Sequence, residues 1–360
     1  GQVVEDVVAD RHLKRPHIFA HACPPSDGSR PGMLRTRFTE MFALTHPIMS
    51  APMALHSGGH LAGAVTAAGG LGSFGGVNPG KGPDWIEAEI ATIRSATAGP
   101  FAIGFITAFI PFFEPLFNAA LGAATPPALI ALSFGDPQPW LDKAKQAGIR
   151  VMCQVQTLDE AARAVDAGTD VLVVQGTEAG GHTGTMSLLP FLATAAQRWP
   201  DVPLLAAGGI ADGRTLAAAL IAGADGAWLG TAFLATPEAV EVHDLHKDLI
   251  VASDGGDTVF DLAYDIVSGL PWPQGIGTRL RRNRFTAEWA GREAELRTRK
   301  EEYAIPPPSP GKPPNPDNDQ ILYGQSAAFV NAVRPAADVV RTICDDAESI
   351  LRTRPSQVLA

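Results

Sequence analysis

A single histidine, His182, stands among four glycines in the stretch VVQGTEAGGHTGT, residues 173–185. The apolar run DVLVV leads into this stretch, and Glu178 is close to the histidine in sequence. Imidazole can take up or hold a proton near neutral pH, which suits it to general acid–base catalysis. Glycines let a backbone curl closely over a flat ligand. The stretch therefore predicts a ligand-covering loop that presents one catalytic imidazole.

Two more glycine-containing loops could bind a phosphate, AAGGIADG at 206–213 and LGTAF at 229–233. Glycine lets backbone N–H groups come close to an anion. In α/β barrels, the loops after the last two strands commonly hold a phosphate in this way. A third segment, SAPMALHSGG at 50–59, offers Pro52 and Met53 as an apolar surface for a flat aromatic ring. By itself, this third segment could equally belong to the core.

The elements that must position these loops alternate along residues 47–231. Short apolar runs predict eight strands, and Ala-rich amphipathic segments between them predict seven helices. Parallel strands need such crossovers, and eight units favour an α/β fold closed into a (β/α)8 TIM barrel, with an open, doubly wound sheet as the alternative. The strands are expected at 47–51, 70–75, 101–107, 128–134, 149–155, 170–176, 203–209 and 226–231, and the helices at 60–69, 83–97, 113–123, 137–147, 157–167, 187–199 and 212–223.

The regular alternation covers only part of the chain. Residues 1–40 are mixed and polar, and we expect them to form an N-terminal extension. Residues 41–236 form the expected barrel core. Residues 237–360 form the expected C-terminal region of helices and loops, which caps the barrel and lines one side of its mouth. Within this region the Pro-rich segment 305–319 cannot be regular helix, and a helical segment at 325–353 should break near Pro335.

Composition restricts the classes of function. The chain has 360 residues, of which 46% are hydrophobic, and 28 basic against 38 acidic side chains give a net charge of −10. This charge argues against a general nucleic-acid binder. The cysteines Cys23, Cys153 and Cys344 form no CxxC pair, which favours a reduced, cytoplasmic protein. The first residues include acidic side chains and lack an apolar stretch, and apolar runs stop short of about 18 residues, so neither a signal peptide nor a membrane span is expected.

The remaining histidines and a basic run give weaker signals. His56 and His60 are four residues apart, but they lack the glutamate of a zinc motif, so no metal site is expected. His243 and His246 lie in a polar helical stretch and are expected on a solvated face. The basic run RLRRNRF at 279–285 favours a solvated or salt-bridged face over an anion site.

Four stretches together resemble the nitronate monooxygenase family, formerly called 2-nitropropane dioxygenases: PIMSAPMA, AAGGLGSFGG, VVQGTEAGGHTGT and AAGGIADGRTLAAALIAGADGAWLGTAFLAT. The segment YGQSAAFVNAVRPAADVV, 323–340, also resembles the final helix of that family. The resemblance implies an enzyme with FMN bound to a TIM barrel, and His182 matches the active-site histidine of the family. It places the phosphate at Gly208, Gly209, Gly230 and Thr231, and the isoalloxazine ring on Ala51, Pro52 and Met53 near Gln175 and Gly176. The other implied cofactor contacts are Gln154, Gly180, Gly181 and Ala207.

The resemblance also implies a reaction. Alkyl nitronates, or nitroalkanes after proton removal, would be oxidised by O2 to a carbonyl compound and nitrite. The expected partners are this small substrate and O2, with no nucleic acid or membrane, in a monomer or homodimer. The alternative is an NAD(P)H-dependent FMN reductase of a quinone or an enoyl thioester, because related barrels carry the same signatures and the cofactor supplies the redox chemistry. A non-redox isomerase or synthase that holds a sugar phosphate is a third reading.

Overall fold

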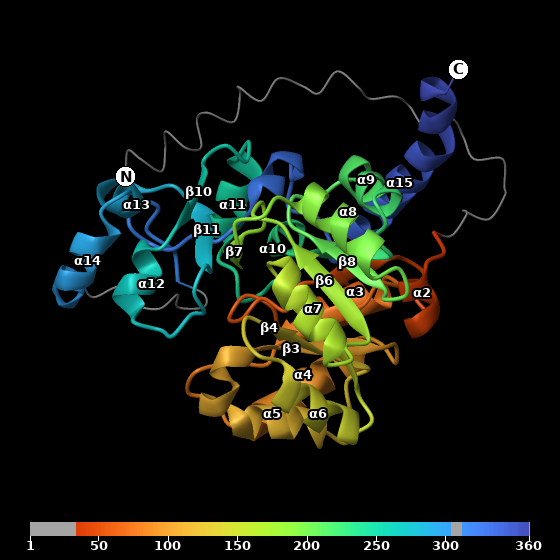
Figure 1. The fold of residues 1–360 in the computed structure, drawn as a ribbon, viewed down its shortest axis with the longest axis horizontal. Helices are drawn as coiled ribbons and strands as arrows, with labels where there is room; N and C mark the ends of the chain where they lie inside the picture. The colour runs from red at the N-terminus through yellow and green to blue at the C-terminus, as the bar shows by residue number, and fades with distance from the viewer. Residues whose placement is uncertain (1–33, 304–311, 360) are drawn as a thin grey trace.

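The structure, a computed structural model, describes residues 34–303 and 312–359, so most of the expected N-terminal extension lies outside it. Its centre is a barrel of eight parallel strands surrounded by helices (Figure 1). All eight predicted strands are present, and their order around the barrel follows the sequence. They are β1 Ile48–Ser50, β2 Gly72–Gly75, β3 Phe101–Ile106, β4 Leu129–Ser133, β5 Arg150–Val155, β6 Val171–Gln175, β8 Leu204–Ala207 and β9 Gly226–Leu229.

Backbone hydrogen bonds close the barrel between β1 and β2. The Leu71 N–H donates to the Ile48 carbonyl at 2.9 Å, and the Ser50 N–H donates to the Leu71 carbonyl at 3.1 Å. The strands are almost entirely buried. This is expected for a parallel barrel, in which helices cover the outer face of each strand and the inner face packs against the other strands. The (β/α)8 prediction is therefore confirmed, and the open-sheet alternative is wrong.

The seven predicted helices also form, and local signals explain several of their ends. The Thr157 side chain caps one helix by accepting the Glu160 N–H, and Asp212 caps another by accepting the Thr215 N–H. Gly148 and Gly168 follow two helix ends with positive φ angles of 78° and 85°, as a left-handed cap requires. The helices are α3 Gly59–Ala67, α4 Pro83–Ala96, α5 Glu114–Leu121, α6 Gln138–Gln146, α7 Leu158–Asp166, α8 Leu188–Arg198 and α9 Gly213–Ile221.

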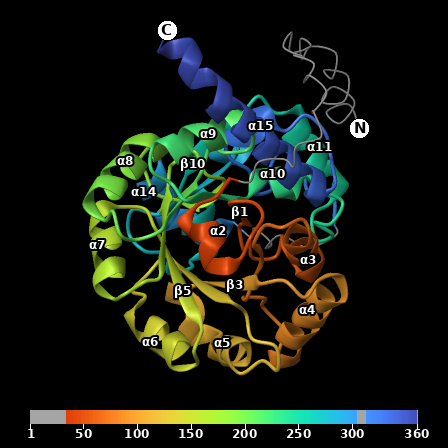
Figure 2. The same ribbon diagram turned by 90° about the vertical axis from the view of Figure 1, so that its right-hand side faces the viewer.

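A short helix, α2 (Arg37–Phe42), closes the amino-terminal end of the barrel and lies over the middle of the ring in Figure 2. It buries Phe38 and Phe42 in a core cluster with barrel residues such as Met49. The Arg37 guanidinium binds the carboxylate of Asp225, which is 8% exposed, with a shortest contact of 2.7 Å. The helix runs through the boundary expected between residues 40 and 41.

The eighth helix position of the barrel is filled by α15 (Ala336–Val358), from the far end of the chain. It packs against α9 and α3, on either side of the gap after β9, where only the four-residue α10 (Thr231–Leu234) follows the strand. The helical segment expected at 325–353 does break near Pro335, which stands at the N-cap of α15. The C-terminal region therefore completes the barrel wall as well as covering its mouth. No helix in the described ranges is long and apolar enough to cross a membrane.

A second, antiparallel sheet was not predicted. It contains β7 (Gly181–Thr183), β10 (Thr258–Asp261) and β11 (Gly277–Arg281), with β11 in the middle. Together with α12 (Ala263–Ser268), α13 (Arg284–Trp289) and α14 (Glu293–Arg299), it forms a lobe beside the barrel (Figure 1). The lobe has its own small core around Trp289, Leu280 and Leu296. Because β7 belongs to the loop after β6, this lobe is joined directly to the predicted catalytic stretch.

Candidate functional site

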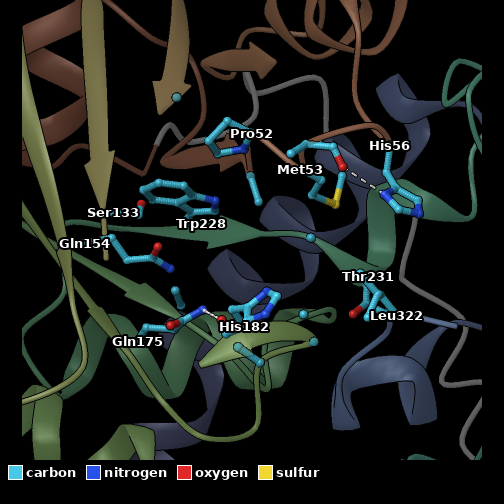
Figure 3. A pocket seen from close by; sticks show the side chains of 18 of the residues that line it. Pro52, Met53, His56, Ser133, Gln154, Gln175, His182, Trp228, Thr231 and Leu322 are labelled. Carbon is cyan, nitrogen blue, oxygen red and sulfur yellow. Dashed lines mark hydrogen bonds between the residues drawn. The ribbon is translucent and has the colours of Figure 1, made fainter. Parts of the chain in front are cut away.

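A cavity of about 300 Å³ opens at the carboxyl ends of the barrel strands. Its lining contains all but one of the residues that sequence analysis proposed for the site: Ala51, Pro52, Met53, Gln154, Gln175, Gly180, Gly181, His182, Ala207, Gly208, Gly209, Gly230 and Thr231. The exception is Gly176, which lies against Leu188 and Glu178 instead. Pro52 and Met53 stand on the side of the cavity opposite Gln175 and His182 (Figure 3).

Polar side chains at the strand ends form one wall of the cavity. Gln156 Nε2 donates to Gln175 Oε1 at 2.9 Å, and Gln175 Nε2 donates to the His182 carbonyl at 3.0 Å (Figure 3). These bonds fix the amide of Gln175 and couple the end of β6 to β7. Gln156 is 1% exposed and holds Gln175 without lining the cavity itself. Sequence analysis did not predict it as a site residue.

The backbone at the predicted phosphate loops can approach a ligand closely. Gly208 and Gly209 have positive φ angles of 96° and 72°, which side-chain-bearing residues rarely adopt. A Cβ added to Gly230 would meet nothing closer than the Met53 sulfur at 3.5 Å, so its face toward the cavity is open. The C-terminal segment closes this end, because the Gly324 N–H donates to Thr231 Oγ1 at 3.0 Å.

His182 is held by residues from the antiparallel lobe. Its Nε2 atom lies 2.9 Å from Asp265 Oδ1 and 3.0 Å from Thr278 Oγ1. Thr278 is the direct cross-strand neighbour of His182 in the β7–β11 ladder, and Asp265 comes from α12. The side chains of His182 and Asp265 are only 17% and 13% exposed, so the pair is largely shielded from water.

Aromatic rings surround the imidazole. The Trp272 indole stacks on it at a centroid distance of 3.4 Å and an interplanar angle of 16°. The Phe134 ring approaches it edge-on at 6.3 Å. Glu178, which stands four residues before the histidine in sequence, points elsewhere, because both of its carboxylate oxygens accept the Leu188 N–H at the start of α8. Asp265 and Trp272, which sequence analysis missed, are therefore the close neighbours of the histidine.

The expectation of a solvated face for His246 is wrong. His246 is buried in α11 (Asp244–Ala252), and its Nε2 atom lies 3.0 Å from the Leu322 carbonyl. Its ring meets the ring of the cavity-lining His56 edge-on at 5.8 Å. Charged neighbours in the sequence suggested solvent, but the C-terminal segment covers this turn of the helix. His243 caps the same helix by accepting the Leu245 N–H.

Because His246 is buried, we expect the stability of the fold to decrease in acid. Burial lowers the pKa of His246 to about 4, whereas an unfolded histidine takes up its proton near pH 6.5. Between these values the unfolded state binds more protons, so the free energy of unfolding falls as the pH falls. We expect His246→Gln to lose less stability between pH 7 and pH 5 than the wild type does. Urea unfolding at both pH values tests this, and equal losses in the two proteins would contradict it.

The basic run also differs from its expectation. Arg279 is 7% exposed and donates from Nε to the Thr177 carbonyl at 2.5 Å and from Nη1 to Thr258 Oγ1 at 3.1 Å. It thus joins the loop after β6 to β10 rather than facing solvent. The expectation of a salt-bridged face holds for Arg281, which lies 3.9 Å from the Asp257 carboxylate. In the described part of the chain, no three His, Cys, Asp or Glu side chains gather as a metal site.

Sequence comparison connects this site to known enzymes. The profile of the nitronate monooxygenase family matches residues 35–109 and 118–346. The chain is 33% identical to the nitronate monooxygenase npaC of Metarhizium robertsii over 335 residues, covering 84% of this chain and 91% of that protein. It is 34% identical to the nitronate monooxygenase of Pseudomonas aeruginosa over 252 residues, covering 56% of this chain and 70% of that protein.

Two solved structures share the fold over most of the chain. FabK from Thermotoga maritima aligns with a TM-score of 0.76 and 27% identity, covering 90% of this chain and 99% of that chain. The nitroalkane oxidase from Streptomyces ansochromogenes aligns with a TM-score of 0.69 and 27% identity, covering 88% and 99%.

Proposed function

Since this chain belongs to the nitronate monooxygenase family of flavin-dependent oxidoreductases, we propose that it oxidises alkyl nitronates, or nitroalkanes after proton removal, with FMN and O2. The products would be a carbonyl compound and nitrite. The observation that carries the proposal is a carboxylate-paired imidazole on the wall of the cavity, opposite the apolar Pro52 and Met53 (Figure 3). Such a geometry suits proton removal from a carbon acid held between the two.

The residues at the cavity fit FMN. Gly209 and Gly230 leave room for a phosphate to approach the backbone, Gly208 lines the same cavity, and Ala51, Pro52 and Met53 would offer the apolar surface that the isoalloxazine ring requires. Gln154 and Gln175 line the same cavity and would offer amide groups to the polar edges of the ring. A Cβ added to Gly181 would meet nothing within 4 Å, so the cover loop also leaves open space. When bound, a flavin would accept the electrons of the substrate and pass them to O2.

The chain's own residues would then act on the substrate. The C–H bond next to the nitro group breaks, its electron pair moves onto the nitro oxygens, and the proton passes to the imidazole of His182. The aromatic and aliphatic lining of the cavity includes Phe105, Ile106 and Phe134, and such a lining excludes water and suits an alkyl chain. A preformed nitronate enters the same cavity without the proton step.

One experiment separates this reaction from the alternative of an NAD(P)H-dependent reductase. The purified, flavin-loaded protein is mixed anaerobically either with a nitronate or with NADH and NADPH, and the flavin absorbance is followed. We expect bleaching by the nitronate alone. Rapid bleaching by a reduced nicotinamide alone would favour the reductase, and a protein that binds no flavin would leave the sugar-phosphate reading.

FMN rather than FAD is expected as the flavin. The sequence suggests a single phosphate site, at the two loops after β8 and β9, and contains no dinucleotide fingerprint. Mass spectrometry of the ligand that heat releases from the protein measures this directly. Recovery of FAD would contradict the assignment, while recovery of FMN would support it.

A further inference from the structure

The carboxylate of Asp265 accepts two hydrogen bonds from the site. Oδ1 faces His182 Nε2 at 2.9 Å, and Oδ2 accepts the Thr278 hydroxyl proton at 3.1 Å. Since the Thr278 proton is used in this way, its oxygen is an acceptor toward Nε2, at 3.0 Å. An ionised carboxylate also only accepts. Both neighbours of Nε2 therefore require that this nitrogen carries the proton.

The other ring nitrogen has different surroundings. Within the described residues, neither a backbone group nor a side chain forms a hydrogen bond with His182 Nδ1. In a neutral imidazole with a protonated Nε2, Nδ1 holds the lone pair and is the basic atom. We propose that Asp265 is a positioning residue that keeps His182 protonated on Nε2, so that Nδ1 accepts the substrate proton, and that its negative charge stabilises the resulting imidazolium.

The fold supports this arrangement from two directions. The β7–β11 register places Thr278 opposite His182, so both lie on one face of the small sheet. The stacked indole of Trp272 fixes the plane of the imidazole, and an aromatic face also favours a cation beside it. Asp265 then needs to fix only the tautomer and the charge. The carboxylate thus plays the role that a buried aspartate plays beside a catalytic histidine in hydrolases.

The first readout does not depend on turnover. In wild-type protein labelled with nitrogen-15 in its histidines, at a pH where imidazole is normally neutral, we expect the His182 signal of a protonated Nε2 and an unprotonated Nδ1. Asp265→Ala should shift this signal toward the opposite tautomer or a mixture. His182→Asn identifies the signal by its loss. A His182 signal that is the same in Asp265→Ala and the wild type would overturn the proposal.

The second readout uses turnover and rests on the proposed function. Asp265→Ala should lower kcat with a neutral nitroalkane by about 10–10²-fold, while kcat with the preformed nitronate changes by less than about threefold. The matched control is Tyr264→Phe, in the same helix, because its hydroxyl bonds to the Asn318 carbonyl and Asn283 at 2.6 and 2.7 Å, away from His182. Tyr264→Phe should keep the wild-type ratio, and an equal loss in both variants would show that Asp265 only stabilises the lobe.

A near-isosteric variant guards against misfolding of Asp265→Ala. The amide of Asp265→Asn keeps the size of the carboxylate, but it carries no charge and its NH2 group can donate to Nε2. We expect the tautomer signal to shift toward a protonated Nδ1 and kcat for nitroalkanes to fall by at least about tenfold. Wild-type kcat in this variant would overturn the charge role. If the wild type turns over neither substrate, the proposed function fails, whereas the tautomer signals still decide the role of Asp265.

Discussion

Replacing His182 with asparagine is expected to lower turnover of neutral nitroalkanes by about 10²–10⁴-fold, the usual contribution of a positioned general base. The fold and the bound flavin should persist, because the described contacts of the imidazole are with Asp265, Thr278 and the surrounding rings, none of which belongs to the barrel strands. Oxidation of a preformed nitronate should fall much less, since it needs no proton removal. The measurement is kcat and KM for a nitroalkane and its nitronate, with flavin-loaded protein.

The control for this experiment is His243→Asn. It removes a histidine outside the cavity, and asparagine replaces histidine well at the N-cap of α11. Both substrates should react with this control as with the wild type. Equal losses for both substrates in His182→Asn would mean that His182 binds the anion rather than acting as a base. No loss for either substrate would make His182 structural and remove it from the site.

The barrel could be predicted from sequence because its signals are local. Each strand is a short apolar run, and two of the helices carry a capping side chain, Thr157 and Asp212. The glycine loops and His182 were predictable for the same reason, since they directly follow those strands. Chain order alone then brings them to one end of the barrel.

The second half of the site depends on contacts that no local pattern reveals. Asp265 is 83 residues from His182 in the chain and lies on a six-residue helix within a segment of scattered turn signals. β7, β10 and β11 are three to five residues long, too short for a clear alternation. For His246 the local pattern gave a wrong prediction. Its charged neighbours Asp244 and Lys247 suggested a solvated face, but the C-terminal segment buries this side of the helix. Contacts between residues far apart in the chain determine both the partner of His182 and the burial of His246.

The two glycines of the phosphate loop differ in what a substitution would test. A Cβ at Gly208 would stand 2.8 Å from the Gly176 carbonyl oxygen and 3.0 Å from the Ala179 nitrogen, so any side chain there disturbs packing first. At Gly209 the nearest atom is the Glu178 Cβ at 3.4 Å, an ordinary contact. Gly209 is therefore the position where ligand approach, rather than a clash within the protein, decides the outcome.

We expect Gly209→Val to weaken flavin binding by about 10–10²-fold, which corresponds to the loss of one charge-assisted hydrogen bond of about 1.5–3 kcal/mol. The φ angle of 72° adds backbone strain of about 1–2 kcal/mol, so the free energy of unfolding should fall as well. Gly148→Val separates the two effects. Its φ is 78°, a Cβ there would meet nothing within 4 Å, and it precedes β5, at the end of the strand away from the cavity.

Flavin titration and urea unfolding of the apoproteins measure both quantities. The two variants should lose similar stability, and only Gly209→Val should lose flavin affinity. Unchanged affinity in Gly209→Val would mean that the loop after β8 is only a turn and that the phosphate binds elsewhere. Equal loss of affinity in Gly148→Val would trace the effect to general loosening of the barrel. Because the two glycines share a backbone conformation and differ in their position relative to the cavity, the comparison isolates the approach of the ligand to the backbone.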